Sequence, residues 1–334
     1  MKKIGIYFLL ASCLLYGCSS KSDNKKKTNE FVYELVKGWP QLTGGYILGQ
    51  PTGIGVDSSN HIFIFHRAGR KWTNPFPDSL ISLSTIVEIE NETGKILNSW
   101  GANQFIMPHG LTVDNANNIW VTDVALHQIF KFSHEGQLLM KLGVARVSGN
   151  DSLHFNLPTD VAVANDGSFY VSDGYGNSRV VKFSSSGKYL FEWGTHGNKQ
   201  GQFDIPHGIT LDKSENVFVA DRQNNRIQIF DSSGAFLREL KNNEAVSQLP
   251  SLAIDSAQNL FAIDYDLTTV LERVKGSTIF KYDSKDSVLF HFGASGEEKR
   301  TPSWFHDIAV DKQGNVYVGD ILGLKVLKFK LKTF

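Results

Sequence analysis

A repeated unit of about 45–55 residues runs through most of this 334-residue chain and constrains its fold more than any other feature. Each unit holds four short apolar runs separated by turn residues. In one unit the runs are Gly208–Asp212, Val217–Asp221, Arg226–Phe230 and Ala235–Leu240. Runs this short, bounded by Gly, Asn and Ser, predict strands and not helices. Six such units predict an all-β ring of six blades with four antiparallel strands each, a six-bladed β-propeller. The alternative is a β-sandwich or a solenoid with irregular repeats.

The two ends of the repeat predict how the ring closes. The sixth unit stops after the run Val326–Phe329 and lacks a full outer strand. The segment Phe31–Val36 precedes the first unit and has no partner of its own. Pairing these segments would join the termini and remove an exposed sheet edge. Because the repeat is continuous, we expect one propeller domain over residues 31–334.

The first thirty residues predict an exported, lipid-anchored protein. Lys2 and Lys3 precede the apolar run Ile4–Tyr16, which is too short to span a bilayer and is typical of a secretion signal. Leu15–Cys18 resembles the bacterial lipobox, in which the cysteine is diacylated and becomes the mature N-terminus. We therefore expect a lipoprotein signal peptide over 1–17 and a lipidated, flexible tether over 18–30. The alternative is an ordinary cleaved signal with an incidental cysteine.

The amino-acid composition limits the kinds of binding partner that we expect for this protein. Lys and Arg together number 34, as do Asp and Glu, so no basic excess points to nucleic acid. The two cysteines, Cys13 and Cys18, both precede the propeller, which therefore has no disulfide despite its expected export. We expect a monomer on the periplasmic side or the cell surface, in contact with the membrane through its lipid alone.

Three histidines occupy one repeat position in every second unit. His109, His207 and His306 are 98 and 99 residues apart. The alternate units carry hydroxyl residues at that position, namely Thr52, Thr159 and Ser251. In a closed six-membered ring, alternate positions lie about 120° apart around the axis. Three imidazoles that converge in this way, with a fourth position open, are typical of a catalytic zinc site.

Longer strings around these positions resemble a known family. They are Ile62–Arg67, Trp120–Gln128, Pro158–Val163, Ser172–Arg179 and Ala220–Gln228. They are similar to strings of peptidyl-α-hydroxyglycine α-amidating lyase, a six-bladed propeller of NHL-type repeats, and the resemblance runs from about Trp39 to Phe329. It implies a carbon–nitrogen lyase that splits a peptidyl-α-hydroxyglycine into a peptide amide and glyoxylate.

The resemblance also implies roles for individual residues. It implies zinc held by His109, His207 and His306. It implies a structural calcium bound by Asp307 and by the backbone carbonyls of Ile54 and Leu111. It implies catalytic roles for Arg67, Tyr175 and Arg222.

The repeat pattern places Arg67, Tyr175 and Arg222 at the histidine end of the channel without reference to the resemblance. Each follows the second strand of its blade, and in a four-stranded antiparallel blade that turn shares a face with the turn that carries the histidines. Tyr175 could accept the proton of the substrate hydroxyl if a metal and an arginine favour its phenolate. An arginine fork suits the substrate carboxylate, and the sequence leaves open which arginine binds it.

Other interpretations of these residues remain open. Arg67 and Arg222 could pair with blade carboxylates, and Tyr175 could be a packing residue of the channel. The aspartates that recur after each second strand are interpreted as turn residues: Asp123, Asp173, Asp221, Asp264 and Asp320. His66, His127 and His154 have no symmetric counterparts and receive no role. A non-catalytic NHL propeller that binds a peptide or glycan is the main alternative function. A calcium-dependent lactonase-like hydrolase ranks lower, because its metal site is rich in carboxylates.

The chain departs from the family pattern in three places. Two disulfides of animal members correspond here to Asn156 with Gly176 and to Phe218 with Ile229. The Met-Pro pair before the third histidine is Trp304–Phe305, which could reshape the substrate pocket. The chain contains no copper monooxygenase domain, so we expect either a separate enzyme that supplies the hydroxyglycine or another N-(α-hydroxy)glycine compound as the substrate.

The lipid anchor gives a direct test. Cys18→Ser removes the thiol that would be acylated, so the variant is expected to become soluble or to remain unprocessed. Fractionation of cells and the mass of the mature N-terminus measure both outcomes. A processed Cys18→Ser protein that still fractionates with membranes would contradict the lipobox interpretation.

Overall fold

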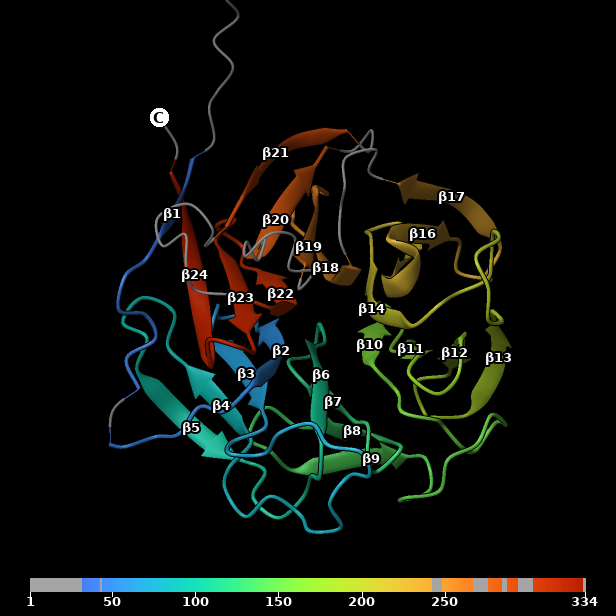
Figure 1. Ribbon diagram of the computed structural model, residues 1–334, viewed down its shortest axis with the longest axis horizontal. Helices are drawn as coiled ribbons and strands as arrows, with labels where there is room; N and C mark the ends of the chain where they lie inside the picture. Colours follow the sequence, from blue (N-terminus) through green and yellow to red (C-terminus); the bar gives the residue numbers. More distant parts are fainter. Residues whose placement is uncertain are drawn as a thin grey trace, which may run out of the picture.

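The computed structural model describes residues 32–42, 44–241, 248–266, 276–283, 287–293 and 303–332. Within these residues the chain forms six four-stranded antiparallel sheets, arranged as blades around a common axis (Figure 1). The six-bladed propeller predicted from the repeat is therefore confirmed. The signal segment and Cys18 lie outside the described residues. In the described part of the chain, no helix has both the length and the apolarity to cross a membrane.

The strands follow the order of the sequence. Blade 1 consists of β2 (Pro51–Val56), β3 (Ile62–His66), β4 (Ile86–Ile89) and β5 (Ile96–Trp100). Blade 2 consists of β6 (Pro108–Val113), β7 (Ile119–Asp123), β8 (Gln128–Phe132) and β9 (Leu138–Leu142). Blade 3 consists of β10 (Asp160–Val163), β11 (Phe169–Asp173), β12 (Arg179–Phe183) and β13 (Tyr189–Trp193).

The second half of the ring repeats this order. Blade 4 consists of β14 (Pro206–Leu211), β15 (Val217–Asp221), β16 (Arg226–Phe230) and β17 (Phe236–Lys241), with the short 3₁₀ helix η1 (Arg222–Asn224) after β15. Blade 5 consists of β18 (Gln248–Ile254), β19 (Leu260–Asp266), β20 (Gly276–Tyr282) and β21 (Val288–Phe292). Blade 6 consists of β22 (Phe305–Val310), β23 (Val316–Asp320), β24 (Lys325–Lys332) and β1 (Val32–Leu35).

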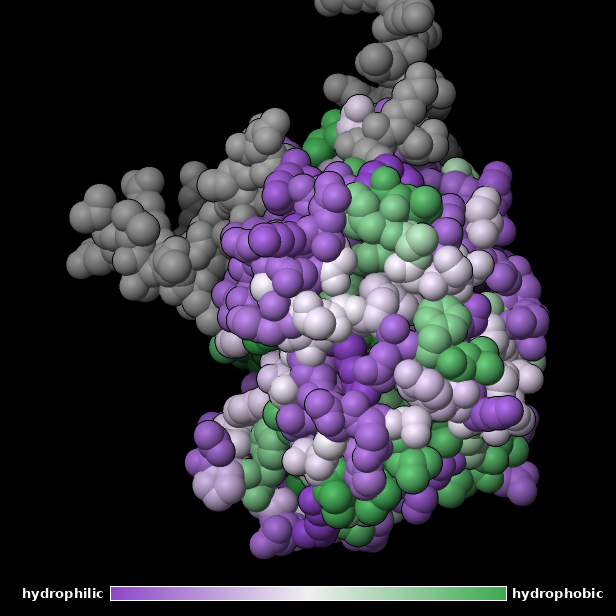
Figure 2. All heavy atoms as spheres, turned by 90° about the vertical axis from the view of Figure 1, so that its right-hand side faces the viewer, coloured by the Kyte–Doolittle hydropathy of each residue, from purple (hydrophilic) through white to green (hydrophobic). Residues whose placement is uncertain are grey.

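Burial changes across each blade in the way the sequence patterns indicate. Every residue of β3, β7, β11, β15 and β23 is buried, as expected for strands packed between neighbouring blades. The outer strand β13 instead alternates between partly buried and exposed residues. Figure 2 shows the side of the ring on which β13 and β17 lie, where hydrophilic and hydrophobic residues are mixed. The core therefore consists of layers between blades, and the rim is its solvent boundary.

Aromatic side chains fill the layers between blades. Phe105, at the start of blade 2, packs edge-on against Phe65 of blade 1, with ring centroids 4.9 Å apart. It also meets Phe130 of its own blade, at 5.2 Å. Such edge-to-face pairs add to the stabilisation that comes from apolar burial alone. Each blade is therefore fixed relative to its neighbour along its buried length.

The ring closes through the N-terminal strand. β1 pairs with β24 in an antiparallel register that runs from Val32 opposite Lys332 to Leu35 opposite Phe329. Tyr33 stacks on Phe292 of blade 5 at 4.3 Å, and its hydroxyl donates a hydrogen bond of 3.0 Å to the carbonyl of Gly314. The spare strand predicted at Phe31–Val36 therefore does complete the last blade.

The recurring aspartates act as turn residues, as predicted. Asp123 accepts hydrogen bonds from the backbone N–H groups of Ile106, Met107, Ala125 and Leu126. Asp221 accepts a bond from the backbone N–H of Asp204, and it pairs with Arg226 at 2.7 Å. These carboxylates tie the turn after each second strand to the segment that enters the blade.

Closure predicts a measurable loss of stability. Tyr33→Ala removes the stack on Phe292 and the bond to Gly314, so the free energy of unfolding is expected to fall by about 2–3 kcal/mol. Chemical denaturation measures this change. Glu34→Ala on the same strand is the control, because Glu34 is exposed and pairs only with the surface residue Lys332. Its effect should stay within about 0.5 kcal/mol. Equal effects of the two substitutions would contradict the proposed role of Tyr33 in closure.

Candidate active site

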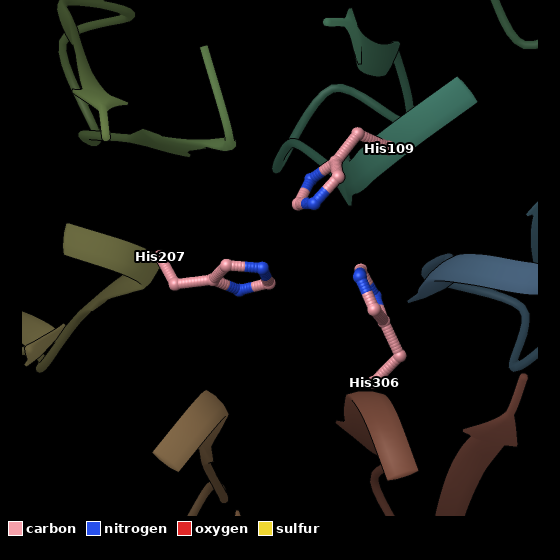
Figure 3. Close-up of side chains that lie close together, drawn as sticks. All are labelled: His109, His207 and His306. Carbon is pink, nitrogen blue, oxygen red and sulfur yellow. The ribbon is translucent and has the colours of Figure 1, made fainter. Parts of the chain in front are cut away.

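Three imidazoles converge on the axis of the ring (Figure 3). His109, His207 and His306 lie on β6, β14 and β22, the first strands of alternate blades. The pairing with the second strand shifts register at each histidine, which marks a β-bulge that redirects the side chain. The ring centroids are 4.7, 4.7 and 5.0 Å apart, and one nitrogen of each ring lies within 4.8 Å of the others. This group could hold a metal ion.

Backbone carbonyls fix the tautomer of all three rings. Nδ1 of His109 lies 2.7 Å from the carbonyl oxygen of Thr159, and Nδ1 of His207 lies 2.7 Å from that of Pro250. Nδ1 of His306 lies 2.8 Å from the carbonyl oxygen of Thr52. Because a carbonyl only accepts, each Nδ1 must donate its hydrogen. In the neutral ring Nε2 then keeps its lone pair, which is the arrangement that metal-binding histidines need.

The surroundings keep these imidazoles neutral. Burial and, after it, the nearby Arg67 guanidinium lower the pKa of His306 to about 3. Burial, His306 and Arg67 together lower the pKa of His109 well below its ordinary value. Burial and then Arg222 do the same for His207. At neutral pH all three side chains are therefore unprotonated at Nε2 and available as ligands.

Tyr175 lies directly against the triad. Its hydroxyl is 3.1 Å from Nε2 of His109 and 3.0 Å from Nε2 of His207. Nη1 of Arg222 donates to the same hydroxyl at 3.2 Å, and the Arg222 guanidinium lies 5.1 Å from the centre of the Tyr175 ring. The phenol oxygen is thus shared between two potential metal ligands and a cation. An alcohol bound next to the triad would meet this oxygen.

Arg67 approaches from blade 1 and is held more tightly than Arg222. Its Nε donates to the carbonyl of Pro108 at 3.0 Å, and its Nη1 donates to Oε1 of Gln50 at 3.0 Å. Burial lowers the pKa of Arg67 to about 10, which leaves it charged at neutral pH. Arg222 differs, because its buried Nε has no hydrogen-bond partner within the described residues. The structure thus brings both predicted arginines and Tyr175 to the same end of the channel as the histidines.

A pair of carboxylates lies beneath the triad. Asp307 accepts a hydrogen bond of 2.6 Å from the backbone N–H of Ile54, and Asp160 accepts one of 3.1 Å from that of Ile209. Together with Ile54 and Leu111 they line a cavity of about 200 Å³. Burial raises the pKa of both carboxyl groups, and the negative charge of Asp307 raises that of Asp160 further. The three residues expected to bind calcium therefore line one cavity, together with a second carboxylate.

Two features of this region are absent from the sequence-based predictions. Asp160 stands where three other blades have glycine, namely Gly53, Gly110 and Gly208, and this departure from the repeat was a usable signal. Trp72 lies over Arg67 at 5.2 Å and against Tyr175 at 5.2 Å, although it is 40% exposed. It follows β3 in a loop that is longer than the segment between the second and third strands of any other blade, so the repeat gave no signal for it.

The residues at which the sequence departs from the amidating-lyase pattern make non-covalent contacts in the structure. The backbone N–H of Gly176 donates to the carbonyl of Asn156 at 3.0 Å, and Phe218 lies opposite Ile229 in the sheet. Both pairs are therefore adjacent without a covalent link. Trp304 stacks on Tyr265 with ring centroids 4.5 Å apart. Burial raises the pKa of Tyr265, and the charge of the nearby Arg222 opposes this rise. Trp304 therefore lies at the same end of the channel as Arg222.

Comparisons with known proteins identify the repeat and its relatives. The NHL repeat matches residues 105–132, 155–183 and 203–230, which fall in blades 2, 3 and 4. Peptidyl-alpha-hydroxyglycine alpha-amidating lyase 1 of Drosophila melanogaster is 33% identical over 92% of this chain and 61% of the fly protein. Peptidyl-glycine alpha-amidating monooxygenase of Mus musculus is 39% identical over 90% of this chain. The chain spans 32% of the mouse protein, so it corresponds to a part of these relatives.

Solved structures share the fold at low identity. A virginiamycin B lyase from Staphylococcus aureus superposes with a TM-score of 0.60 and 14% identity, and covers 91% of this chain and 100% of its own. A gluconolactonase from Xanthomonas campestris superposes with a TM-score of 0.61 and 13% identity, and covers 90% of each chain. At this identity the likeness concerns the propeller architecture alone.

Proposed function

We propose that this protein is a zinc-dependent lyase that cleaves the C–N bond of a peptidyl or acyl α-hydroxyglycine to give an amide and glyoxylate. The observation that carries the proposal is the position of the Tyr175 hydroxyl between two Nε2 atoms of the triad and Arg222. The similarity to amidating lyases over about nine tenths of the chain supports the same reaction.

The triad fits zinc. His109, His207 and His306 offer three unprotonated Nε2 atoms, oriented by Nδ1–H bonds to carbonyls, and three histidines are a known ligand set of catalytic zinc. When bound, zinc supplies a Lewis acid that polarises a substrate oxygen. Three buried neutral nitrogens with an open side toward Tyr175 suit that role.

Tyr175 is the group assigned to proton transfer. It accepts the proton of the substrate hydroxyl, and the electron pair of that O–H bond forms the aldehyde C=O of glyoxylate as the C–N bond breaks. The electrons of the C–N bond go to the amide nitrogen, which takes up a proton. Arg222 donates a hydrogen bond of 3.2 Å to the phenol oxygen, so a positive charge lies next to the atom that would accept the proton. Oxidation state is conserved throughout, so no redox partner is needed.

Arg222 is also the better candidate for the substrate carboxylate. Its Nε is buried without a partner among the described residues, while Nε and Nη1 of Arg67 are already bonded. A buried unsatisfied donor is costly, and a carboxylate would satisfy it. Trp72, which is half exposed above Arg67 and Tyr175, offers an apolar surface to the acyl part of the substrate.

The second cavity fits a structural calcium ion. Asp307, with the carbonyls of Ile54 and Leu111, would hold it, and Asp160 adds a second carboxylate to the same cavity. Hard oxygen ligands are those that calcium prefers. A cation there would offset the burial that raises the pKa of both carboxyl groups. We also propose that the N-terminal lipid on Cys18 anchors the enzyme at the cell envelope.

The reaction itself provides the first test. Purified protein is expected to release glyoxylate from α-hydroxyhippurate, and removal of the metal with a chelator is expected to abolish this release until zinc is restored. A colorimetric assay for glyoxylate and the appearance of benzamide measure both products. Absence of zinc-dependent turnover on this and on larger acyl-hydroxyglycines would favour the non-catalytic propeller that binds a peptide or glycan.

Tyr175→Phe tests the assigned base. Loss of the hydroxyl is expected to lower kcat by about 10²–10⁴-fold, because general-base help is lost. The zinc of the histidine triad should be retained, whereas His207→Ala should lose both that zinc and turnover. Tyr170→Phe is the matched control, since Tyr170 belongs to the same blade but its hydroxyl donates to the carbonyl of Ser232. Near-normal turnover of Tyr175→Phe at saturating substrate would show that another group takes the proton.

A further inference from the structure

A second cluster of potential metal ligands lies at the other end of blade 1, and the repeat shows how unusual it is. In most blades an aspartate ends the first strand, and an asparagine four residues later donates its Nδ2 hydrogen to that carboxylate. The pairs are Asp114 with Asn118, Asp212 with Asn216, Asp255 with Asn259 and Asp311 with Asn315, at 2.8–2.9 Å. In blade 1 the aspartate is Asp57, and the residue four positions later is His61.

The third strand of blade 1 departs from the repeat as well. In the third strand, the residue opposite the second residue of the second strand is a lysine in blades 2, 3, 5 and 6: Lys131, Lys182, Lys281 and Lys328. Lys131 lies 3.8 Å from Asp114, and Lys281 lies 3.8 Å from Asp255. In blade 1 this position is Glu88. Blade 1 therefore has a glutamate where blades 2 and 5 have a lysine that lies near the turn aspartate.

The neighbouring blade supplies the fourth residue. At two other blade junctions the lysine reaches across to a carbonyl of the next blade, as Lys182 does to Ser232 and Lys328 does to Asn91. At the junction of blades 1 and 2 the next blade instead presents His134, whose Nε2 is 2.9 Å from Oδ2 of Asp57. Its ring packs edge-on against Phe63 at 5.2 Å, which holds it in place.

The four donor atoms have the spacing of a tetrahedral site. Nδ1 of His61 is 2.8 Å from Glu88 and 3.5 Å from Asp57, and Nε2 of His134 is 2.9 Å from Asp57 and 3.8 Å from Glu88. All four lie within 4.8 Å of one another. These distances bracket the separation of about 3.4 Å expected between the N and O ligands of tetrahedral zinc.

We infer that Asp57, His61, Glu88 and His134 form a zinc site that links blade 1 to blade 2. The carboxylate side chains are only 1% and 8% exposed, and in the described part of the chain their ion pairs are with these two histidines. The cluster brings two buried carboxyl groups together, and a bound divalent cation would offset the cost of burying them. Two imidazoles favour zinc over calcium or magnesium. The histidines are about 30% exposed, so an ion can enter from solvent.

This site is separate from the proposed active site. Thr52, whose carbonyl oxygen is bonded to His306, lies near the start of β2, whereas Asp57 follows the end of that strand. The inference therefore does not depend on the proposed lyase activity. Its expected role is to tie two blades together, where other junctions use a lysine.

The test restores the residues that other blades carry. The double variant His61→Asn/Glu88→Lys recreates the Asp–Asn–Lys arrangement of blade 5 and should therefore fold. Wild type and variant are stripped with a chelator, dialysed against zinc and measured for zinc per chain by mass spectrometry. The variant is expected to hold one equivalent fewer than wild type, and the zinc-dependent rise of its thermal midpoint should shrink. Glyoxylate release should be unchanged.

Three further variants separate the possible outcomes. His134→Gln, which alters only a partly exposed ligand, should also lose the extra equivalent, while His207→Ala should keep it. His154→Asn is the control, because within the described residues the ion pair of His154 is with Asp151, and this variant should bind zinc as wild type does. If wild type and the double variant bind equal amounts of zinc, the cluster is a set of histidine–carboxylate ion pairs and the inference is wrong.

Discussion

The hydrogen bonds between β1 and β24 hold the ring closed, and the candidate active site depends on that closure. β1 completes the sheet that also carries His306, whereas His109 and His207 lie in sheets that contain neither β1 nor β24. Each blade packs mainly on its neighbours, so an open arc would let His306 move away from the other two. A strand from the start of the domain therefore fixes the geometry of a site built at its centre.

The repeat made much of the fold and part of the site predictable. Strands of about five residues, separated by Gly and Asn turns, predicted the blades, and the alternation of histidine with Thr or Ser predicted the convergence on the axis. The resemblance to amidating lyases added Tyr175, whose position after a second strand placed it at the same end of the channel. These positions could be predicted because each followed from the repeat or from a short local sequence, and both can be recognised in the sequence without knowledge of contacts between blades.

What remained unpredicted depends on contacts between blades. Asp160 and Asp307 face each other only after the ring closes, and His134 reaches Asp57 only across a blade junction. Trp72 acquires its neighbours through the path of a loop that no other blade shares. Positions that depart from the repeat are also informative. Glu88, which stands where four other blades have a lysine, marks the second cluster of potential metal ligands.

The histidine orientation has a consequence for redesign. All three Nδ1 atoms bond to main-chain oxygens of the intervening blades, at Thr52, Thr159 and Pro250. A substitution at one of those positions changes the side chain but leaves the main-chain carbonyl in place. The orientation of the three imidazoles is therefore expected to tolerate such substitutions. Each two-blade unit thus carries one histidine of the triad and one main-chain oxygen that orients a histidine of the triad.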